Sequence, residues 1–326
     1  MEALRNKSIL VTGATGTIGS FVADALIRYS QKNNADTVIY LGGRNAEKLR
    51  HQFGIQKNVD FLQYDMNAPI GFNVHVDYII HAAGNAHPAA FNGNPVGTTM
   101  GNIESTFRLL EYLRLHEGKR LLYVSSGEVY GQGDVSLDSF DELYSGYLDV
   151  LSPRSCYPLS KRMTENLCSS YWKQYGVESV IVRPCHTYGP YMTETDNRAH
   201  AQFFRNALDG ENIILKSAGT QFYSYLYVMD SVSGLLTVLL NGESGEAYNI
   251  SDDASDIMLK DLAAIIADYA GNKVVFEIPD AVESAGYSKA TKARLDSSKL
   301  NGLGWKAKYD IKTGIARTIE MLKAIN

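Results

Sequence analysis

A tyrosine and a lysine four residues apart could carry acid–base chemistry in this chain. Tyr157 and Lys161 stand in the run CYPLSK, and a helix places residues at this spacing on one face. Free tyrosine titrates near about pH 10, and a neighbouring ammonium favours its phenolate form. Tyr157 could therefore act as a base near neutral pH, with Lys161 as its supporting cation. Such a pair is common by chance, so the interpretation depends on other motifs.

A second group of reactive side chains follows the predicted strand at 120–125. Ser125, Ser126 and Glu128 stand in the run LLYVSSGEVYG, where that strand ends. We expect Ser126 to hydrogen-bond the reacting hydroxyl or carbonyl of a substrate, and Ser125 to bond to backbone. Both serines could instead cap the strand end. Glu128 could assist catalysis or could orient the loop backbone.

A glycine-rich turn near residue 10 is typical of a dinucleotide site. Residues 10–19 read LVTGATGTIG, between an apolar run and an amphipathic segment. Gly13 permits a tight turn, Gly16 lets a pyrophosphate approach the backbone, and Gly19 allows the helix to pack closely on the strand. The phosphates would face the unpaired N–H groups of the helix N-terminus. The other residues expected to bind there are Thr15, Thr17 and Ile18.

The end of the second predicted strand indicates which dinucleotide could bind. An acidic residue usually contacts the ribose of NAD at this point, but residues 42–45 read GGRN. Arg44 could bind the 2′-phosphate of NADP instead, which favours NADP over NAD. It could also be a solvated surface arginine.

Two further strand ends could complete the cofactor site. Asp65 could hold the adenine amino group and Met66 could cover the ring, although Asp65 could simply cap a loop. The small residues Ala82, Ala83 and Gly84 follow the fourth strand, where a dinucleotide would cross the sheet edge.

These segments require alternating strands and helices. Short apolar runs predict strands at 8–12, 37–41, 60–64, 76–81, 120–125 and 179–183, mostly separated by helix-length amphipathic segments. The alternation predicts an α/β fold with a Rossmann-type, doubly wound parallel sheet. Helices near 199–208, 259–269 and 313–323 and a β segment near 213–217 predict a smaller mixed α/β cap over the strand ends.

The expected domains follow from this pattern. A dinucleotide-binding domain should cover residues 1–185, with a return segment near 226–250. A discontinuous substrate-binding cap should come mainly from residues 186–326.

Composition narrows the functional classes. The 326 residues carry a net charge of -5, which argues against a nucleic-acid-binding surface. The longest apolar stretches are far shorter than the roughly 20 residues of a membrane span, and no export signal precedes the first strand. The three cysteines show no metal-ligand spacing. We therefore expect a cytoplasmic protein without a metal site or a membrane partner.

The order of these motifs resembles that of the extended short-chain dehydrogenases. The resemblance covers nearly the full chain and rests on the glycine turn, Asp65, HAAG at 81–84, Asn102, SSGEVYG at 125–131, Tyr157 with Lys161, and RPxxxYGP at 183–190. The chain is similar to nucleotide-sugar epimerases, 4,6-dehydratases and UDP-glucuronate decarboxylases.

The resemblance implies an enzyme with oxidoreductase or lyase chemistry and a bound NAD or NADP that oxidises a nucleotide-activated sugar at C4. Tyr157 would be the base, Ser126 its hydrogen-bonding partner and Lys161 the supporting cation. Asn102 would be a structural residue of the active site. A homodimer is also implied, paired through helices at 102–116 and 157–175.

The type of reaction depends on Glu128 and its surroundings. A carboxylate at this position is similar to that of the dehydratases and decarboxylases, and many plain epimerases lack it. The dehydratases carry an acid immediately before it, where this chain has Gly127. A dehydratase would therefore lack its usual proton donor. The segment from 187 to 230 looks most like the decarboxylases.

Three residues depart from the decarboxylase pattern at expected substrate contacts. His186 replaces an asparagine, and Tyr191 and Tyr223 replace arginines that would bind the diphosphate. A tyrosine offers one neutral donor where arginine offers a charged fork. Arg198, Arg205 or Arg294 could compensate. The residues predicted to contact substrate are Asn85, Ser126, His186, Tyr191, Arg198, Tyr223 and Arg294.

The same positions also have purely structural interpretations. His186 could be a buried, hydrogen-bonded polar residue, and the tyrosines could be packing aromatics. An alternative enzyme is an NADP-dependent reductase or dehydrogenase that acts on a sugar or other small carbonyl substrate and releases its product after one hydride transfer. A non-catalytic dinucleotide-sensing protein is the alternative from another class.

Overall fold

A seven-stranded parallel sheet forms the centre of the protein. The computed structural model describes residues 1–84, 86–192, 196–277 and 291–325. The strand order is β10-β6-β5-β4-β1-β2-β3, and each neighbouring pair is parallel. The strands are β1 (Ser8–Thr12), β2 (Val38–Gly43), β3 (Val59–Gln63), β4 (Tyr78–His81), β5 (Arg120–Val124), β6 (Glu178–Pro184) and β10 (Ala247–Ile250).

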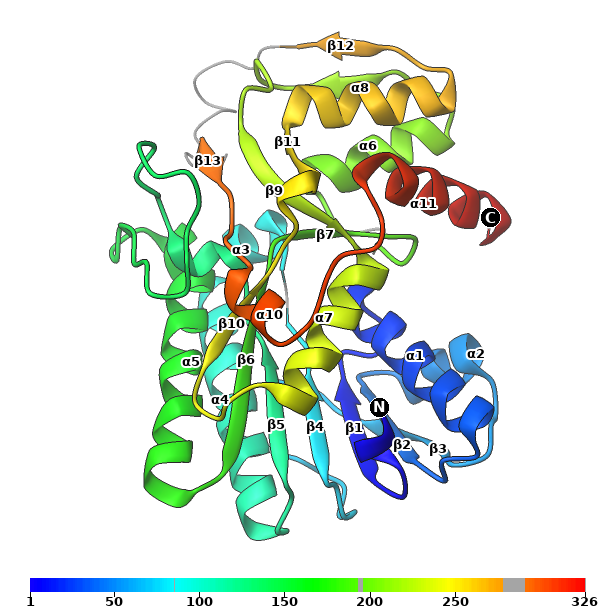
Figure 1. Ribbon diagram of the computed structural model, residues 1–326, viewed down its shortest axis with the longest axis vertical. Coiled ribbons are helices and arrows are strands. Elements are labelled where there is room, and N and C mark those ends of the chain that lie inside the picture. The colour runs from blue at the N-terminus through cyan, green and yellow to red at the C-terminus, as the bar shows by residue number, and fades with distance from the viewer. Residues whose placement is uncertain (85, 193–195, 278–290, 326) are drawn as a thin grey trace.

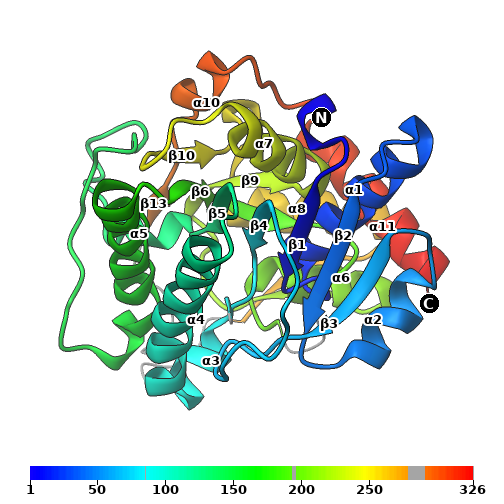
Figure 2. The same cartoon turned by 90° about the horizontal axis from the view of Figure 1, so that it is seen from below.

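Helices cover both faces of this sheet, as Figure 2 shows from below. On one face α1 (Thr17–Asn33) packs with α7 (Val228–Asn241), and on the other α4 (Pro95–Leu115) packs with α5 (Cys156–Tyr175). The short helices α2 (Ala46–Phe53) and α3 (Pro88–Gly93) connect strands to these layers. A parallel sheet enclosed in this way must be apolar on both sides.

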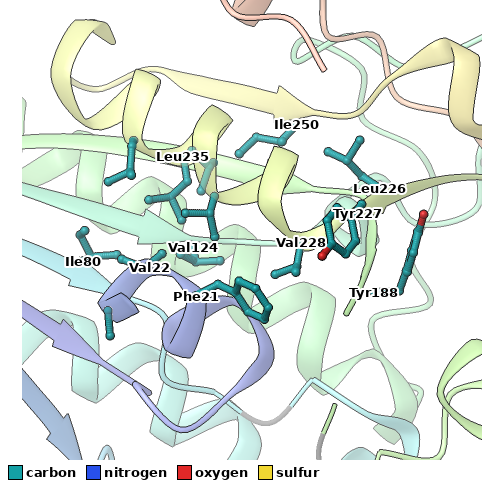
Figure 3. Close-up of a cluster of buried hydrophobic side chains, with 14 of the residues drawn as sticks. Phe21, Val22, Ile80, Val124, Tyr188, Leu226, Tyr227, Val228, Leu235 and Ile250 are labelled. Carbon is teal, nitrogen blue, oxygen red and sulfur yellow. The ribbon is translucent and has the colours of Figure 1, made fainter. Parts of the chain in front are cut away.

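Alternate residues of each strand supply the two cores. Ile9 and Val11 of β1 belong to the core beneath α1 and α7, whereas Leu10 belongs to the core beneath α4 and α5. Successive side chains of a strand point to opposite faces, which explains the division. Figure 3 shows the first core, where Phe21 and Val22 of α1 approach the Leu235 region of α7.

A smaller cap lies over the carboxyl ends of the strands (Figure 1). Its four-stranded sheet is centred on β9, which pairs with β7, β11 and β13, and a further two-stranded sheet joins β8 and β12. The cap elements are β7 (His186–Tyr188), α6 (Ala199–Leu208), β8 (Ile213–Leu215), β9 (Phe222–Tyr227), β11 (Asp256–Met258), α8 (Leu259–Ala270), β12 (Val274–Phe276), β13 (Lys292–Ala293) and α11 (Ile311–Ile325). The small helix α10 (Ser298–Gly302) packs on β10.

The predicted strands and cap elements occur with shifts of one or two residues at their ends, but α4 begins at Pro95 and not at the predicted residue 102. The strands of the large sheet begin and end close to the predicted residues, and α6 has the predicted bounds of 199–208. The region predicted as a return segment contains α7 and β10, and β10 extends the large sheet beyond β6. The exact domain limits of 1–185 and 186–326 stay a prediction.

The sequence predicts neither a membrane span nor a metal site. None of the helices that the structure describes combines the length and apolar character of a membrane span. Within the same residues, no cluster of three or more His, Cys, Asp or Glu side chains has the arrangement of a metal site.

A buried histidine joins three elements of the large domain. His81 at the end of β4 lies 2.7 Å, through Nδ1, from the Thr12 hydroxyl of β1 and 3.0 Å, through Nε2, from the Ser105 hydroxyl of α4. Burial, aided by the charge of Lys161, lowers the pKa of His81 to about 3. The imidazole is therefore neutral in the native protein at neutral pH.

This histidine should make the protein sensitive to acid. Below about pH 6.5 the unfolded chain protonates His81 while the native chain does not, so its contribution to the free energy of unfolding should fall by up to about 1.4 kcal/mol per pH unit. Denaturant unfolding between neutral and mildly acidic pH should show a smaller slope for His81→Gln than for the wild type. His51→Gln, at an exposed position of α2, is the control. Equal slopes in the wild type and His81→Gln would contradict the assignment.

Candidate active site

The glycine turn between β1 and α1 is tightly packed. Gly13 has a φ of +71°, and a Cβ built on it would lie 2.7 Å from the carbonyl carbon of Ala82. A Cβ on Gly19 would lie 2.1 Å from the carbonyl oxygen of Gly13. Both positions therefore require glycine, one for backbone conformation and both for close approach. Gly16 has the looser surroundings expected where a ligand approaches.

The turn leads into a helix terminus that fits a pair of phosphates. Gly16 is the N-cap of α1, and its N–H donates to Gly13 at 3.0 Å. The next N–H groups, beginning at Thr17 and Ile18, have no partner within the helix because they belong to its first turn. Thr15, Thr17 and Ile18 are all partly exposed. The residues present thus form the cradle predicted for a dinucleotide.

The residues predicted around the ribose and adenine occupy the matching strand ends. Arg44 is exposed directly after β2, and Asn45 caps α2 by accepting from the Lys48 N–H at 3.0 Å. Asp65 follows β3 and accepts from the Asn67 N–H at 2.9 Å. Asp65 therefore caps this loop, which is one of its two predicted roles. Its contact with adenine stays a prediction. Met66 packs toward Gly101 of α4.

The small residues after β4 connect the cofactor turn to the catalytic helix. The N–H of Ala82 donates to Thr12 at 3.2 Å, and that of Ala83 approaches the Thr12 hydroxyl at 3.4 Å. A Cβ built on Gly84 would lie 3.9 Å from the Lys161 ammonium. The nicotinamide end of the expected cofactor site therefore lies beside Lys161.

Tyr157 and Lys161 occupy the first turns of α5, and both are buried. The Lys161 ammonium donates to the carbonyl of Val124 at 2.8 Å and lies 5.6 Å from the centre of the Tyr157 ring. Ser126, the N-cap of a short 3₁₀ helix at 127–130, lies close enough to Tyr157 for its hydroxyl to lower the pKa of the phenol. The structure thus brings Ser126, Tyr157 and Lys161, three of the four residues predicted to be catalytic, together at the carboxyl end of β5.

Asn102 has the structural role implied by the resemblance. Its amide donates to the Ser160 hydroxyl at 2.9 Å, and that hydroxyl donates to the Tyr157 carbonyl at 2.9 Å. Asn102 therefore connects α4 to the turn of α5 that holds Tyr157.

The electrostatics of Tyr157 differ from the expectation based on sequence. Burial first, and then the charge of Glu128, raise the pKa of Tyr157 to about 12, against the lowering effects of Ser126, Arg198 and Arg154. Burial also lowers the pKa of Lys161 to about 7, against the opposing effect of Glu165. The expected ionisation near neutral pH is therefore not a property of the side chains alone, because desolvation of the phenol outweighs the nearby cations. An oxidised nicotinamide ring would add positive charge near Tyr157 only when the cofactor is bound.

Ser125 makes a side-chain hydrogen bond in addition to the predicted backbone hydrogen bond. Its N–H donates to Val182 at 2.8 Å, as predicted for a backbone-bonded residue, but its hydroxyl donates to the carboxylate of Glu165. Glu165 is in turn paired with Arg183 at 2.7 Å. Ser125 therefore anchors the strand end to a buried ion pair behind the site.

Glu128 is held in an ion pair that sequence reasoning missed. Arg154, in the turn before α5, places two guanidinium nitrogens 3.2 Å from the Glu128 carboxylate. Arg154 also lies over the ring of Phe91 in α3, which stacks on Tyr157. The spacing of Arg154 three residues before Tyr157 was a signal that could have identified it. The position of Phe91 had no comparable signal.

Gly127, between Ser126 and Glu128, faces a filled space. A Cβ built there would lie 3.2 Å from the Leu295 side chain and 3.5 Å from the carbonyl oxygen of Pro184. A Cβ at this position would require the Leu295 side chain to move by a few tenths of an ångström. The acid expected of a dehydratase is thus absent from the sequence, and the apolar Leu295 lies beside the position where its side chain would begin.

The cap contributes an aromatic wall at two of the three departures, His186 and Tyr223. His186 stacks on Tyr223 with ring centres 5.0 Å apart, and Tyr225 lies close to both rings. Burial and the charge of Arg198 lower the pKa of His186 to about 4. His200 is also buried beside these rings, and its Nε2 has no hydrogen-bonding partner within the described residues. Sequence reasoning did not single out His200.

The remaining predicted substrate residues have different surroundings. Tyr191 packs against Phe21 of α1, and its carbonyl accepts from Thr17, so it lies next to the glycine turn. Arg294 pairs with Asp256. Asn85 lies outside the described residues.

Arg198 is a predicted substrate-contact residue of the cap whose charge reaches Tyr157. It pairs with Asp196 at 2.6 Å, and its electrostatic partners include Tyr157 and Glu128. Its charge acts on Tyr157, although it was predicted as a compensating contact for a diphosphate.

Comparison with known proteins decides the family. Residues 9–251 match the NAD dependent epimerase/dehydratase family. The chain belongs to this family. It is 31% identical, over 97% of its length, to UDP-glucuronic acid decarboxylase 1 of Xenopus tropicalis, of which it covers 72%. It is 32% identical, over 95% of its length, to UDP-glucuronic acid decarboxylase 6 of Arabidopsis thaliana, of which it covers 87%.

Solved structures show the same fold. UDP-glucose 4-epimerase of Thermotoga maritima has a TM-score of 0.84 at 24% identity and covers 98% of this chain and 99% of its own. A dTDP-glucose 4,6-dehydratase of Streptomyces venezuelae has a TM-score of 0.81 at 24% identity, with 97% of each chain covered. The predicted Rossmann-type fold and the predicted class, an NAD-dependent enzyme of the epimerase/dehydratase family, are confirmed. The relatives and solved structures named above act, by their names, on nucleotide sugars.

The geometry predicts a specific loss for Tyr157→Phe. Turnover should fall by at least about 100-fold, because the buried ring remains but can no longer transfer a proton. Cofactor affinity, measured by fluorescence titration, should stay close to that of the wild type. Tyr123→Phe removes a different buried hydroxyl next to Lys161 and should retain activity. Unchanged turnover in Tyr157→Phe would remove Tyr157 from the mechanism.

Proposed function

We propose that this protein decarboxylates a nucleotide-activated uronic acid of the UDP-glucuronic acid type. The observation that carries the proposal is the site around Glu128, where the carboxylate is paired with Arg154 and Leu295 fills the space beside Gly127. This arrangement lacks the acid that would protonate a departing C6 hydroxyl. The relatives named above, which carry decarboxylase names, support the same choice.

The residues suit the oxidation of a sugar hydroxyl. Tyr157 would take the proton of the C4 hydroxyl while Ser126 holds the oxygen, and Lys161 would hold the nicotinamide ribose and supply positive charge. A bound nicotinamide dinucleotide would supply the hydride acceptor and donor at C4. Gly13, Gly16 and the first turn of α1 would hold its phosphates.

Loss of carbon dioxide follows from the position of the resulting ketone. A C4 ketone is β to the C6 carboxylate, so the C5–C6 bond can break with its electron pair moving to the C4 oxygen. The Tyr157 and Ser126 hydroxyls can stabilise that oxygen by hydrogen bonds. A proton then adds at C5, and the ketone is reduced, so the overall reaction consumes no cofactor.

Two cations near Tyr157 are each already paired with an acidic side chain, Arg154 with Glu128 and Arg198 with Asp196. Arg154 and Arg198 both act electrostatically on Tyr157, and therefore lie near the part of the sugar that would react. The contacts of His186, Tyr191, Arg198, Tyr223 and Arg294 with substrate stay predictions. The ion pair of Arg294 with Asp256 makes it a weaker substitute for a phosphate-binding arginine.

A panel of nucleotide sugars tests the proposed reaction. Purified protein should convert UDP-glucuronic acid into a product that is lighter by the mass of carbon dioxide, with only catalytic amounts of cofactor. UDP-glucose, dTDP-glucose, GDP-mannose and a CDP sugar serve as comparison substrates. A product lighter by the mass of water, or an epimer of unchanged mass, would contradict decarboxylation.

Net reduction is the second candidate function. The replacement of two expected phosphate-binding arginines by Tyr191 and Tyr223 favours a substrate without the usual diphosphate. Consumption of one reduced cofactor per product in the same assay would support this alternative and overturn the first.

We also propose that NADP binds in preference to NAD. Arg44 is exposed directly after β2, residues 42–45 contain no carboxylate, and a guanidinium suits a 2′-phosphate. Arg44→Ala should weaken NADP binding by about 10-fold or more, the effect of losing a charge-assisted hydrogen bond, and leave NAD binding nearly unchanged. Titrations of both cofactors measure this. A wild type that binds NAD more tightly than NADP would contradict the preference.

A homodimer through α4 and α5 is a further proposal. These helices pack together and expose large apolar side chains, which a second copy could cover. A particle of 36.0 kDa in solution would contradict it. The exposed side chains are Val96, Met100, Phe107, Leu115, Met163, Trp172 and Tyr175. A cytoplasmic location also stays a prediction.

A further inference from the structure

The short helix α3 places one aromatic ring directly against the catalytic tyrosine. Phe91 is completely buried. Its ring stacks on that of Tyr157 with centres 4.5 Å apart and planes inclined by 19°. Aromatic pairs in such contact restrict each other's orientation and add stability beyond area burial.

The same ring contacts the cation that holds Glu128. The guanidinium carbon of Arg154 lies 4.8 Å from the centre of the Phe91 ring, within the range of a cation–π contact. Arg154 also forms the two-nitrogen ion pair with the Glu128 carboxylate. Phe91 therefore touches both the residue that would transfer the proton and the residue that orients the neighbouring carboxylate.

We propose that Phe91 is a positioning residue that fixes the Tyr157 ring and the Arg154–Glu128 ion pair relative to each other. The inference rests on the proposed function, because it assigns Phe91 a task in that site. Phe91 has no titratable or hydrogen-bonding group, so it acts only through the two side chains that it touches.

The placement matters because the two charges have opposite effects on Tyr157. Glu128 raises the pKa of Tyr157 and Arg154 lowers it. Coulomb energies between such groups change steeply with distance inside a protein. A contact that holds both charges at fixed distances from the phenol therefore helps to set its acidity. Arg198 acts on the same phenol from the cap.

A purely structural role for Phe91 makes a different prediction. A core phenylalanine that is trimmed to leucine should lower stability without changing proton transfer specifically. The chain contains a matched control in Phe140, which is 1% exposed and stacks on Tyr144 with centres 4.5 Å apart and planes inclined by 12°. Phe140 contacts neither Tyr157 nor Arg154 in any ring interaction that the structure records.

The test compares Phe91→Leu with Phe140→Leu in the full-length protein. Phe91→Leu should lower kcat by about 10- to 100-fold with little change in KM, as expected for a misplaced catalytic group. Phe140→Leu should lose comparable thermal stability but keep kcat. Phe91→Tyr retains the ring and should recover most of the activity. Equal kcat in Phe91→Leu and the wild type would overturn the proposal.

The pH profile gives a second readout that stability alone would not move. Tyr157 must be ionised to act as a base, so its pKa sets the acidic limb of kcat. Arg154→Gln should move that limb to higher pH and Glu128→Gln to lower pH. In the Phe91→Leu background both shifts should shrink, because the two charges are no longer held against the phenol. Full-sized shifts in that background would contradict the proposal.

A substrate-free measurement separates this inference from the proposed function. Protein labelled with [¹³Cζ]tyrosine and saturated with NAD reports the ionisation of Tyr157 by NMR, with its signal assigned by loss in Tyr157→Phe. The titration midpoint should move in Phe91→Leu by roughly one pH unit and stay in place in Phe140→Leu. If the panel shows no turnover but this shift occurs, the proposed function fails and the positioning role stands. If turnover occurs without the shift, the positioning role fails.

Discussion

The structure depends on the burial of a phenol next to charged groups. Tyr157 is withdrawn from water at the start of α5, and desolvation makes its ionised form costly. Lys161, Arg154 and Arg198 come from the catalytic helix, the turn before it and the cap, and each is held by its own acceptor or ion pair. Catalysis of the proposed kind requires that these charges stay fixed while the substrate changes its own charge. The packing around the site supplies that rigidity.

The parallel sheet explains how distant residues reach one place. The carboxyl ends of β1, β4 and β5 deliver the glycine turn, the 82–84 segment and Ser126 to the same edge, and α4 and α5 pack behind them. His81 and Asn102 connect these layers by hydrogen bonds between buried side chains. The cap then covers this edge with rings from β7, β9 and α6. The large domain thus positions the residues that are proposed to react. The cap carries residues that differ from the decarboxylase pattern and would distinguish one substrate from another.

Sequence reasoning recovered the fold because its signals are local and periodic. Apolar runs, the glycine spacing and the Tyr157–Lys161 interval each follow from the geometry of one strand, turn or helix. It did not recover the electrostatics of Tyr157, since burial depends on contacts between elements far apart in the chain. Phe91 and His200 were missed for the same reason, because nothing in their local sequence differs from an ordinary core residue. Arg154 could have been found, because its helical spacing from Tyr157 is visible in the sequence.

The surroundings of Leu295 have a consequence for the order of folding. This residue fills the space beside Gly127 and belongs to a small core with Val129, Tyr130 and Phe140. Its backbone carbonyl accepts from the Ser251 hydroxyl, and its N–H donates toward Ser224. The loop that carries Glu128 is thus completed by a segment that is made only after about nine-tenths of the chain has been synthesised. During synthesis the dinucleotide cradle can form early, whereas the reaction chamber closes only near the end of translation.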